Sequence, residues 1–471
     1  MSHVAKHLQF DELFVVSDLH FGGEAGFQIF ASTAEFVALV EHVANLASER
    51  KAALVINGDF IDFLAEQPHE HFSPDNAVAK LDRVCADATF APIFAALRAL
   101  LKTPNRVLLI NLGNHDLELA LPWVQQHLFE RLSGVDDAAR GRIYCVMDGT
   151  GLRCRVANAD ALILHGNEFD EWNATDYHQF RTLTRDLQFG KNVDAWLPSA
   201  GARMVIEVMN KIKKQYPFVD LLKPEIAGVA KVLGFVDASF SKELTAIAAF
   251  QARALKDAIR MKMDLLNVSV AGAGAPIAGE KGLAFASEDA FLDQLDNIPD
   301  QGNSAADMLG FFSAIQAKIG QKNPAEVLRL ALDGLAMDQS FELTEKDSTY
   351  QRATARISSE IAFVITGHTH FLRAIARPHG AYFNSGTWAR LIEVRPEQSK
   401  NEASFQPIFQ VLSATTLAEL DRIQGENAVK VVQKRCPVVH LYEAHGRCLA
   451  ELKQVQAGVL VMIENTRFQG S

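Results

Sequence analysis

Short apolar runs recur along the chain, and each of them ends at a group of polar residues. The five runs are LFVVSDLHFGG, AALVINGDFIDF, RVLLINLGNHD, ALILHGNEFDEW and AFVITGHTHFL. Short runs rich in β-branched residues predict buried strands. A turn explains any single polar end, because Gly-Asn and Asp are common in turns. Five repetitions of one layout, most of them beside a glycine, are hard to explain by turns alone.

The polar residues at these strand ends are of the kinds that bind metal ions. They are Asp18, His20, Asp59, Asp62, Asn114, His115, His165, His368 and His370. In an open α/β sheet the carboxyl ends of the strands lie at one edge, where ligands bind. We therefore expect these side chains to gather in space. Asp116, which follows His115, is expected to shape the turn.

Asp, Asn and His without a thiolate form a ligand set that suits Mn, Fe, Zn, Co or Ni rather than calcium. Two Asp, one Asn and four His are too many for one tetrahedral site, but they suit two ions with Asp59 between them. Two ions about 3.5–4 Å apart lower the pKa of a shared water and hold the attacking and leaving oxygens of a displacement at phosphorus.

Strand-like and helix-like stretches alternate over residues 12–185, which predicts a layered α/β core. From 186 to 355 apolar residues recur at helical spacing, except in the Gly/Ala/Pro stretch AGAGAPIAGEKG, which predicts a loop. The remainder, 356–471, is strand-like. We predict a core of residues 1–185 and 356–471, interrupted by a helical insertion, or cap, at 186–355.

The predicted insertion carries basic residues at KIKK (211–214) and at Arg253, Lys256, Arg260 and Lys262. A solvated helix face explains them, and the alternative is a lid that meets an anionic substrate.

Composition narrows the class of protein. The chain has 471 residues with a formal net charge of −11, which argues against a protein that coats nucleic acid without excluding a local basic patch. Five scattered cysteines with no C-x-x-C pair favour a reducing, cytoplasmic location. Because the first residues lack an apolar signal core and no apolar run has the roughly 20 residues of a membrane span, we expect neither secretion nor an integral membrane segment.

The motifs Asp-x-His, Gly-Asp-x-x-Asp, Gly-Asn-His-Asp, His-Gly and Gly-His-x-His occur here in that order. They resemble the calcineurin-like metallophosphoesterases. The resemblance implies an α/β fold, a four-layer α-β-β-α sandwich with a dinuclear site at one edge. By motif position it implies two ligand sets that share Asp59: Asp18, His20, Asp59 and His370 for one metal, and Asp59, Asn114, His165 and His368 for the other.

The same resemblance implies that His115 is the catalytic histidine, which stabilises the transition state or protonates the leaving oxygen. Asp62 matches the carboxylate that orients it. The implied cofactors are two divalent metal ions, with Mn expected first and Fe, Zn, Ni or Co as alternatives. The implied reaction is hydrolysis of a phosphomonoester, phosphodiester or diphosphate bond by a metal-bridging hydroxide.

Neighbouring residues distinguish the branches of this family. Ser/Thr phosphoprotein phosphatases have arginines where this chain has Phe63 and Leu112, and purple acid phosphatases have a tyrosine that 58–64 lacks. The segment 165–181 is similar to that of UDP-2,3-diacylglucosamine diphosphatases, with Asp176, Tyr177, Phe180 and Arg181 in matching places, and NSGTW (384–388) resembles their site-closing segment. Those enzymes carry Arg in place of His115, and their cap is shorter.

We therefore expect an enzyme that acts on a small phosphorylated or nucleotide-linked substrate. A metal-dependent nuclease is one alternative, because DNA-repair exonucleases share the metal motifs. A scaffold that kept the fold without catalysis is another, although no ligand is missing from the set. The sequence does not indicate an oligomeric state.

Overall fold

The computed structural model describes residues 8–170, 172–191, 196, 198–222, 325, 326, 328–330, 332 and 341–470. Contacts divide the chain into two compact units, one of Met1–Val229 with Leu328–Ser471 and one of Ala230–Val327. The helices and strands below belong to the first unit. The predicted limits of the insertion, 186 and 355, stay predictions. The predicted loop at 271–282 and the basic residues Arg253, Lys256, Arg260 and Lys262 lie outside the described residues.

All five apolar runs contain a strand, and three of these strands lie together in a seven-stranded sheet. β2 (Glu12–Val16), β3 (Ala52–Asn57) and β4 (Arg106–Asn111) are parallel neighbours. The full spatial order is β15 (Val459–Gln469), β14 (Arg447–Gln456), β13 (Pro437–Ala444), β2, β3, β4 and β5 (Ile143–Val146). β13 pairs with β2 antiparallel, so the end of the chain completes a sheet that its beginning started.

The other two predicted strands, β7 (Ala159–Ile163) and β8 (Phe363–Thr366), are parallel neighbours in a six-stranded sheet. Its order is β1 (Gln9–Phe10), β6 (Leu152–Val156), β7, β8, β10 (Gly380–Ser385) and β9 (Leu372–Arg377). A small third sheet pairs β11 (Leu391–Ile392) with β12 (Val432–Gln433).

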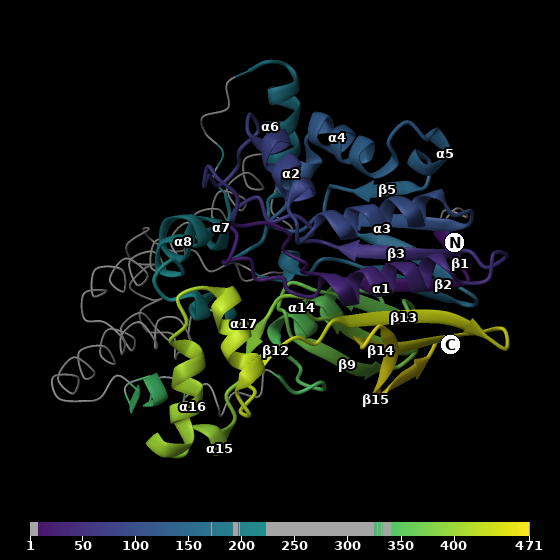
Figure 1. Ribbon diagram of the computed structural model, residues 1–471. Coiled ribbons are helices and arrows are strands. Elements are labelled where there is room, and N and C mark those ends of the chain that lie inside the picture. Colours follow the sequence, from purple (N-terminus) through teal and green to yellow (C-terminus); the bar gives the residue numbers. More distant parts are fainter. Residues whose placement is uncertain are drawn as a thin grey trace, which may run out of the picture. The chain divides into compact units, whose positions relative to one another are not determined.

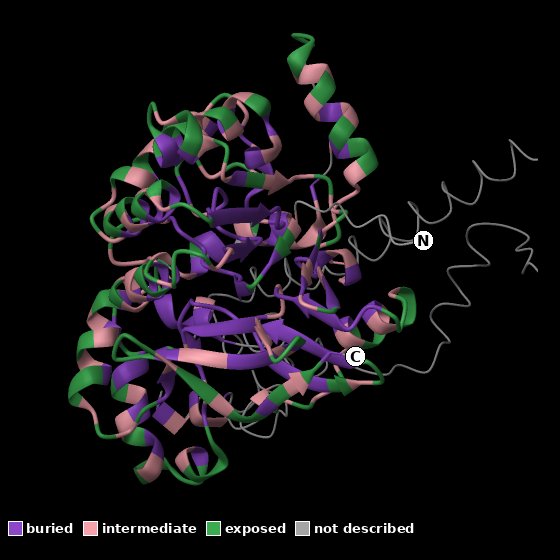
Figure 2. Ribbon diagram, turned by 90° about the vertical axis from the view of Figure 1, so that its right-hand side faces the viewer, coloured by how far each residue is buried: buried purple, intermediate pink, exposed green. Residues whose placement is uncertain are grey.

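The apolar runs are continuous because their strands are buried on both faces. Along β2, Leu13 and Val15 pack into the core between the two large sheets, while Phe14 and Val16 pack under the helices. Figure 2 shows the central strands buried inside the unit, whereas exposed residues lie on the outer helices and on the edge strand β15.

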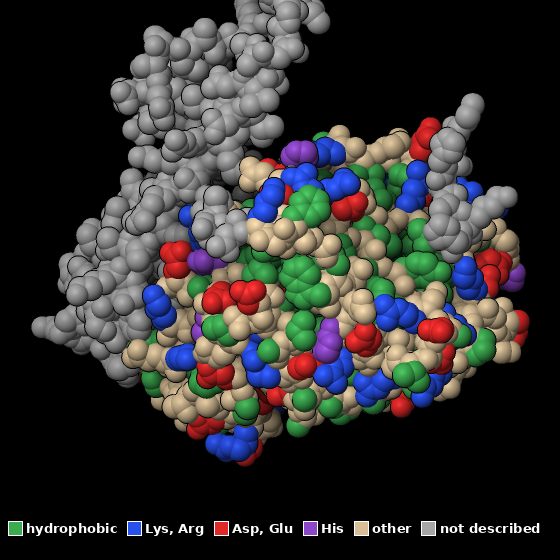
Figure 3. All heavy atoms as spheres, turned by 90° about the horizontal axis from the view of Figure 1, so that it is seen from above, with side chains coloured by type: hydrophobic (Ala, Val, Ile, Leu, Met, Phe, Trp, Pro, Cys, Tyr) green, Lys and Arg blue, Asp and Glu red, His purple; other side chains and the backbone are tan. Residues whose placement is uncertain are grey.

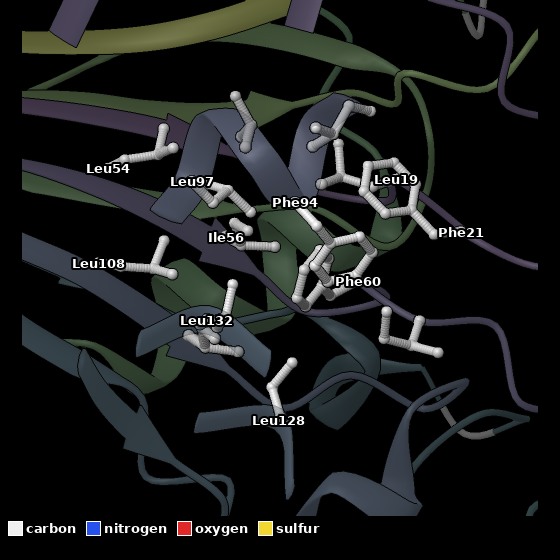
Figure 4. Close-up of a cluster of buried hydrophobic side chains, with 14 of the residues drawn as sticks. Leu19, Phe21, Leu54, Ile56, Phe60, Phe94, Leu97, Leu108, Leu128 and Leu132 are labelled. Carbon is white, nitrogen blue, oxygen red and sulfur yellow. The ribbon is translucent and has the colours of Figure 1, made fainter. Parts of the chain in front are cut away.

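Helices cover the outer face of each large sheet. α1 (Thr33–Ala44), α2 (Ala77–Ala86), α3 (Ala91–Lys102) and α4 (Pro122–Ser133) share one apolar core with the seven-stranded sheet (Figure 1). In that core Phe94 and Leu97 of α3 pack with Leu54, Ile56 and Leu108 of the strands (Figure 4). On the six-stranded sheet, α14 (Ser348–Arg356) packs through Ala353 and Tyr350. The expected four-layer α-β-β-α sandwich is confirmed.

The prediction that residues 356–471 are strand-like is wrong for the stretch that holds α15 (Pro396–Ser399), α16 (Glu402–Leu412) and α17 (Leu417–Glu426). α16 buries Phe405, Ile408 and Leu412, which are spaced as on one helix face, and Asn401 caps its first turn. Pro407 inside the helix weakened the sequence signal.

The described start of the predicted insertion is helical. It contains α7 (Ala200–Met204), a π-helical turn (Val205–Met209) and α8 (Asn210–Ile212), followed by a 3-10 turn at Pro217–Leu221. Asn210 donates to the Leu64 carbonyl oxygen at 3.1 Å, which ties this segment to the loop after β3.

In the KIKK segment, Lys213 Nζ lies 3.6 Å from Asp220 and Lys214 Nζ lies 3.4 Å from Glu24, so both ammonium groups meet carboxylates.

Among the described helices, no single one is long and apolar enough to cross a membrane. α2 and α3 meet the length and composition criteria only together, across a 93° bend.

Candidate metal centre

The predicted site residues come together where strands of both large sheets end. Three groups of side chains have their potential ligand atoms within 4.8 Å of one another. These groups are Asp18, His20 and His370; Asp59, His165 and His368; and His20, Asp62 and His115.

Asp59 lies between the first two groups. Its Oδ2 is 3.3 Å from His165 Nε2 and 3.7 Å from His20 Nε2. Within the first group, His370 Nε2 lies 3.1 Å from His20 Nε2 and 3.3 Å from Asp18 Oδ1. The two groups therefore form one continuous cluster that meets at the Asp59 carboxylate.

Five of these residues adopt a backbone conformation that side chains rarely take. Their φ angles are 52° for Asp18, 49° for His20, 51° for Asp59, 67° for His368 and 64° for His370. A left-handed φ in a residue other than glycine costs free energy and persists only where the surrounding structure imposes it. Such residues are concentrated at functional sites.

The recurring glycines let the strand ends approach each other. A Cβ at Gly113 would lie 2.2 Å from Asp59 Oδ1, and a Cβ at Gly58 would lie 2.2 Å from His165 Nδ1. Both distances are far below van der Waals contact, so no residue with a side chain fits at either position.

Buried polar atoms of the cluster fit a cation. Asn114 Oδ1 and His165 Nε2 are buried, and neither has a hydrogen-bond partner among the described residues. A buried polar atom without a partner costs about 1–3 kcal/mol, and a bound cation would remove that cost at an acceptor. Asp, Asn and His donors of this number suit divalent transition metals.

The charge balance of the cluster agrees with this fit. Burial alone would lower the pKa of His165, but the carboxylate of Asp59 raises it to about 10. Burial alone would raise the pKa of Asp18, but hydrogen bonding to His370 lowers it to about 2. The buried carboxylates thus favour positive charge beside them, whether imidazolium or metal.

Contacts at Nδ1 fix the ring orientations of His165 and His20. The backbone oxygen of Asn57 lies 2.8 Å from His165 Nδ1, and Asp62 Oδ2 lies 3.1 Å from His20 Nδ1. Both oxygens are acceptors, so each Nδ1 carries the hydrogen and each Nε2 faces the cluster. Partners of this kind fix the tautomer of metal-binding histidines.

His115 is the most accessible ring among the predicted site histidines. Its side chain is 18% exposed, against 3% for His20 and 0% for His165. His115 Nδ1 lies 3.2 Å from Asp62 Oδ1, so one carboxylate holds both His20 and His115. Burial alone would raise the pKa of Asp62, yet the charge of His115 and its hydrogen bond hold it well below its usual value.

Asp116 shapes the turn, as predicted. Its carboxylate accepts from the backbone nitrogens of Gly113 at 2.6 Å and Phe60 at 2.8 Å, which joins the loops after β4 and β3. Burial and the neighbouring Asp59 raise the pKa of Asp116 to about 7.

The NSGTW segment (384–388) forms hydrogen bonds to the backbone at Asp18, a member of the first ligand group, and at Gly367. Thr387 Oγ1 donates to the Asp18 carbonyl oxygen at 2.7 Å, and Asn384 Nδ2 donates to the Gly367 carbonyl oxygen at 2.7 Å. Trp388 is buried, and its indole nitrogen donates to the Pro437 carbonyl oxygen. The tryptophan is thus a core residue.

Sequence reasoning missed three polar residues that support the cluster. Asp170 contacts His368, while Asn57 and Asn111 link the ends of β3 and β4 to the other sheet through the carbonyl oxygens of Leu164 and Ile163. A signal was available, since each asparagine is the last residue of its strand and follows a run of apolar residues.

The segment similar to the diphosphatases starts a helix. Asp176 caps α6 (Tyr177–Gln188) by accepting from the backbone nitrogens of His178 and Gln179, and Phe180 is buried in the core.

Comparison with known proteins agrees with the geometry. Residues 12–220 match the family model described as calcineurin-like phosphoesterase, and no curated protein matches the chain. The matched range contains Asp18 to His165, and the fold adds His368 and His370 from beyond it. Residues 12–220 of this chain are therefore similar to calcineurin-like phosphoesterase domains.

Proposed function

We propose that this protein is a dinuclear-metal-dependent phosphoesterase that hydrolyses a phosphomonoester, phosphodiester or diphosphate bond. The observation that carries the proposal is the pair of ligand groups that meet at the Asp59 carboxylate.

We assign one metal to Asp18, His20, Asp59 and His370, and the other to Asp59, Asn114, His165 and His368. Mn is the expected metal, with Fe, Zn, Ni or Co as alternatives that the donor set also suits. Two divalent ions, when bound, supply an activated water and neutralise the charge of a phosphate.

We propose that His115 is the residue that contacts the substrate. Its Nδ1 donates to Asp62, so the opposite ring nitrogen, Nε2, is the one that can reach a substrate oxygen. There it would stabilise charge on the phosphoryl group or give a proton to the leaving oxygen. The ionised Asp62 would stabilise the imidazolium form and hold the ring in place.

We propose a small phosphorylated or nucleotide-linked substrate, as in the branch of the UDP-2,3-diacylglucosamine diphosphatases. The residues at 176–181 support a relationship with that branch. His115 stands where those enzymes carry arginine, which supports a relative with another substrate. A cytoplasmic location belongs to the same proposal, and all five cysteines are free thiols.

A metal-dependent nuclease is the second candidate, because its metal site would be the same. The formal net charge of −11 argues against a nuclease, because nucleic acid is also negatively charged. Acidic and basic side chains are interspersed over the described part of the face shown in Figure 3. A non-catalytic scaffold is the third, and the complete set of donors in the cluster argues against it.

The test is hydrolysis after the chelated protein is reloaded with Mn, Ni, Co or Zn. The substrates are p-nitrophenyl phosphate, bis(p-nitrophenyl) phosphate, a panel of UDP-sugars and single-stranded DNA. We expect metal-restored activity that Asp59→Ala abolishes and that Asp137→Ala, a change at an exposed carboxylate of α5 (Asp137–Arg140), leaves intact.

Cleavage of DNA alone would favour the nuclease. No hydrolysis by protein that holds two ions would favour the scaffold.

A further inference from the structure

An acidic side chain that none of the predicted motifs includes contacts a predicted metal ligand. Asp170 Oδ2 lies 2.9 Å from His368 Nε2. Asp170 follows the 3-10 turn Asn167–Phe169 after β7, and His368 follows β8, so the contact joins the ends of two neighbouring strands.

Asp170 is itself held in place. Its Oδ2 accepts from Asn173 Nδ2 at 2.7 Å, and its Oδ1 accepts from the backbone nitrogen of Trp172 at 2.9 Å. The Asp170 side chain is 30% exposed and that of His368 is 9% exposed, so the pair is largely shielded from solvent. Two bonds within its own loop thus hold the Asp170 carboxylate in addition to its contact with His368.

The contact determines which nitrogen of His368 faces the cluster. A carboxylate accepts only, so His368 Nε2 carries the hydrogen and its Nδ1 carries the lone pair. His20 and His165 are held the opposite way, through Nδ1. The backbone nitrogen of His368 also donates to Asp18 Oδ2 at 2.9 Å, which fixes the residue at its main chain as well.

We propose that Asp170 is a positioning residue that fixes the tautomer and orientation of His368, so that Nδ1 binds the metal shared with Asp59, Asn114 and His165. The inference rests on the proposed dinuclear centre. On this proposal, Asp170 affects the affinity of the metal position that contains His368. The affinity of the other metal position is unaffected. Loss of such a partner typically lowers metal affinity about 10–100-fold.

The experiment is a stepwise titration of chelator-treated, full-length protein with Mn²⁺ by calorimetry, followed by electron paramagnetic resonance of the loaded samples. Asp170→Asn keeps the size of the side chain but removes its charge, and its amide can also donate to the imidazole, which favours the wrong tautomer. We expect one of the two affinities to fall about 10–100-fold, the other to stay unchanged, and the spin-coupled dinuclear signal to weaken at limiting metal.

The matched control is Asp176→Asn, a carboxylate in the same connection that caps α6. This variant is expected to leave both Mn²⁺ affinities and the melting temperature nearly unchanged, because asparagine caps a helix about as well as aspartate. Two unchanged affinities in Asp170→Asn would overturn the inference, as would an equal fall of both affinities or the same single fall in Asp176→Asn. A wild-type protein that binds fewer than two ions would overturn the proposed dinuclear centre as well, and this outcome is visible before any variant is made.

Discussion

At the scale of single residues, four consecutive positions after β4 have four different tasks. Gly113 allows Asp59 to approach, and Asn114 offers a buried amide oxygen. His115 contacts Asp62, and Asp116 joins two loops through backbone nitrogens. Because each task depends on a different chemical property, substitutions here should have separable effects.

We predict that His115→Ala lowers kcat on the preferred phosphoester by about 10²–10⁴-fold, the usual contribution of a general acid or base. Metal content should remain at two ions, because His115 is in neither proposed ligand set. Steady-state kinetics combined with metal analysis of the same samples checks both statements. A variant as fast as wild type would show that His115 does not act on the substrate.

Gly113→Ala is expected to damage the metal centre itself. The new Cβ would lie 2.2 Å from Asp59 Oδ1 and 2.4 Å from the Asp59 backbone nitrogen, so the backbone must move. We expect lower Mn²⁺ affinity and a lower melting temperature, measured by calorimetry and thermal unfolding.

The control for that substitution is Gly425→Ala in α17, where a Cβ meets nothing within 4 Å. It should raise stability by about 0.5–1 kcal/mol, because alanine is the better helix former. Normal Mn²⁺ binding by Gly113→Ala would contradict the close approach of the two loops.

At the scale of elements, a pair of buried amides joins the two sheets beneath the cluster. Asn111 Nδ2 donates to Asn57 Oδ1 at 2.9 Å, and Asn57 Nδ2 donates to the Leu164 carbonyl oxygen at 2.8 Å. Leu164 precedes His165, so these bonds align β3 and β4 with the end of β7. Strands of different sheets share no ladder, and side chains must therefore set their alignment.

We predict that Asn57→Ala lowers the free energy of unfolding by about 2–4 kcal/mol, because it leaves the Leu164 carbonyl and one amide of Asn111 without their partner. Asn76→Ala, at the start of α2 and without a side-chain cap bond, should change stability by less than about 1 kcal/mol. Urea unfolding of both variants measures the difference. Equal stabilities would show that the amide bridge does not hold the sheets together.

At the scale of the whole molecule, one buried carboxyl should make stability depend on pH. Glu118 is buried and accepts from the backbone nitrogen of Ser73 at 3.0 Å, and burial raises its pKa from 4.5 to about 7. The folded protein therefore binds more protons than the unfolded chain between these values. The contribution of protonated Glu118 to the free energy of unfolding is therefore fully present below about pH 4.5. It is lost as the pH rises through about 7.

We predict that Glu118→Gln is more stable than the metal-free wild type at pH 8, by at most about 3 kcal/mol, and that the difference disappears near pH 5. Glutamine keeps the acceptor for Ser73 but has no charge to bury. Urea unfolding at several pH values measures this, with the exposed Glu41→Gln of α1 as control. A difference that does not change with pH would show that Glu118 does not titrate in this range.

Much of the fold could be predicted because the strands of the core are buried on both faces and leave unbroken apolar runs. The helices α15, α16 and α17 were missed because Pro407 and short lengths conceal their periodicity. Most of the cluster could be predicted because metal-binding side chains follow the carboxyl ends of parallel strands, although these strands lie in two sheets. Asp170 could not, since an acidic residue in a loop has no distinctive pattern of its own.

The sequence by itself determined which residues follow each strand, and therefore the chemistry of the cluster, because side-chain type and strand termination are local properties. Only the tertiary structure decided that three of those strands lie in one sheet and two in the other, and that Asp59 lies between two histidine groups. It alone brought Asp170 to His368 across 198 positions of the chain. Such contacts depend on how whole sheets pack against each other, and packing is a property of the complete core.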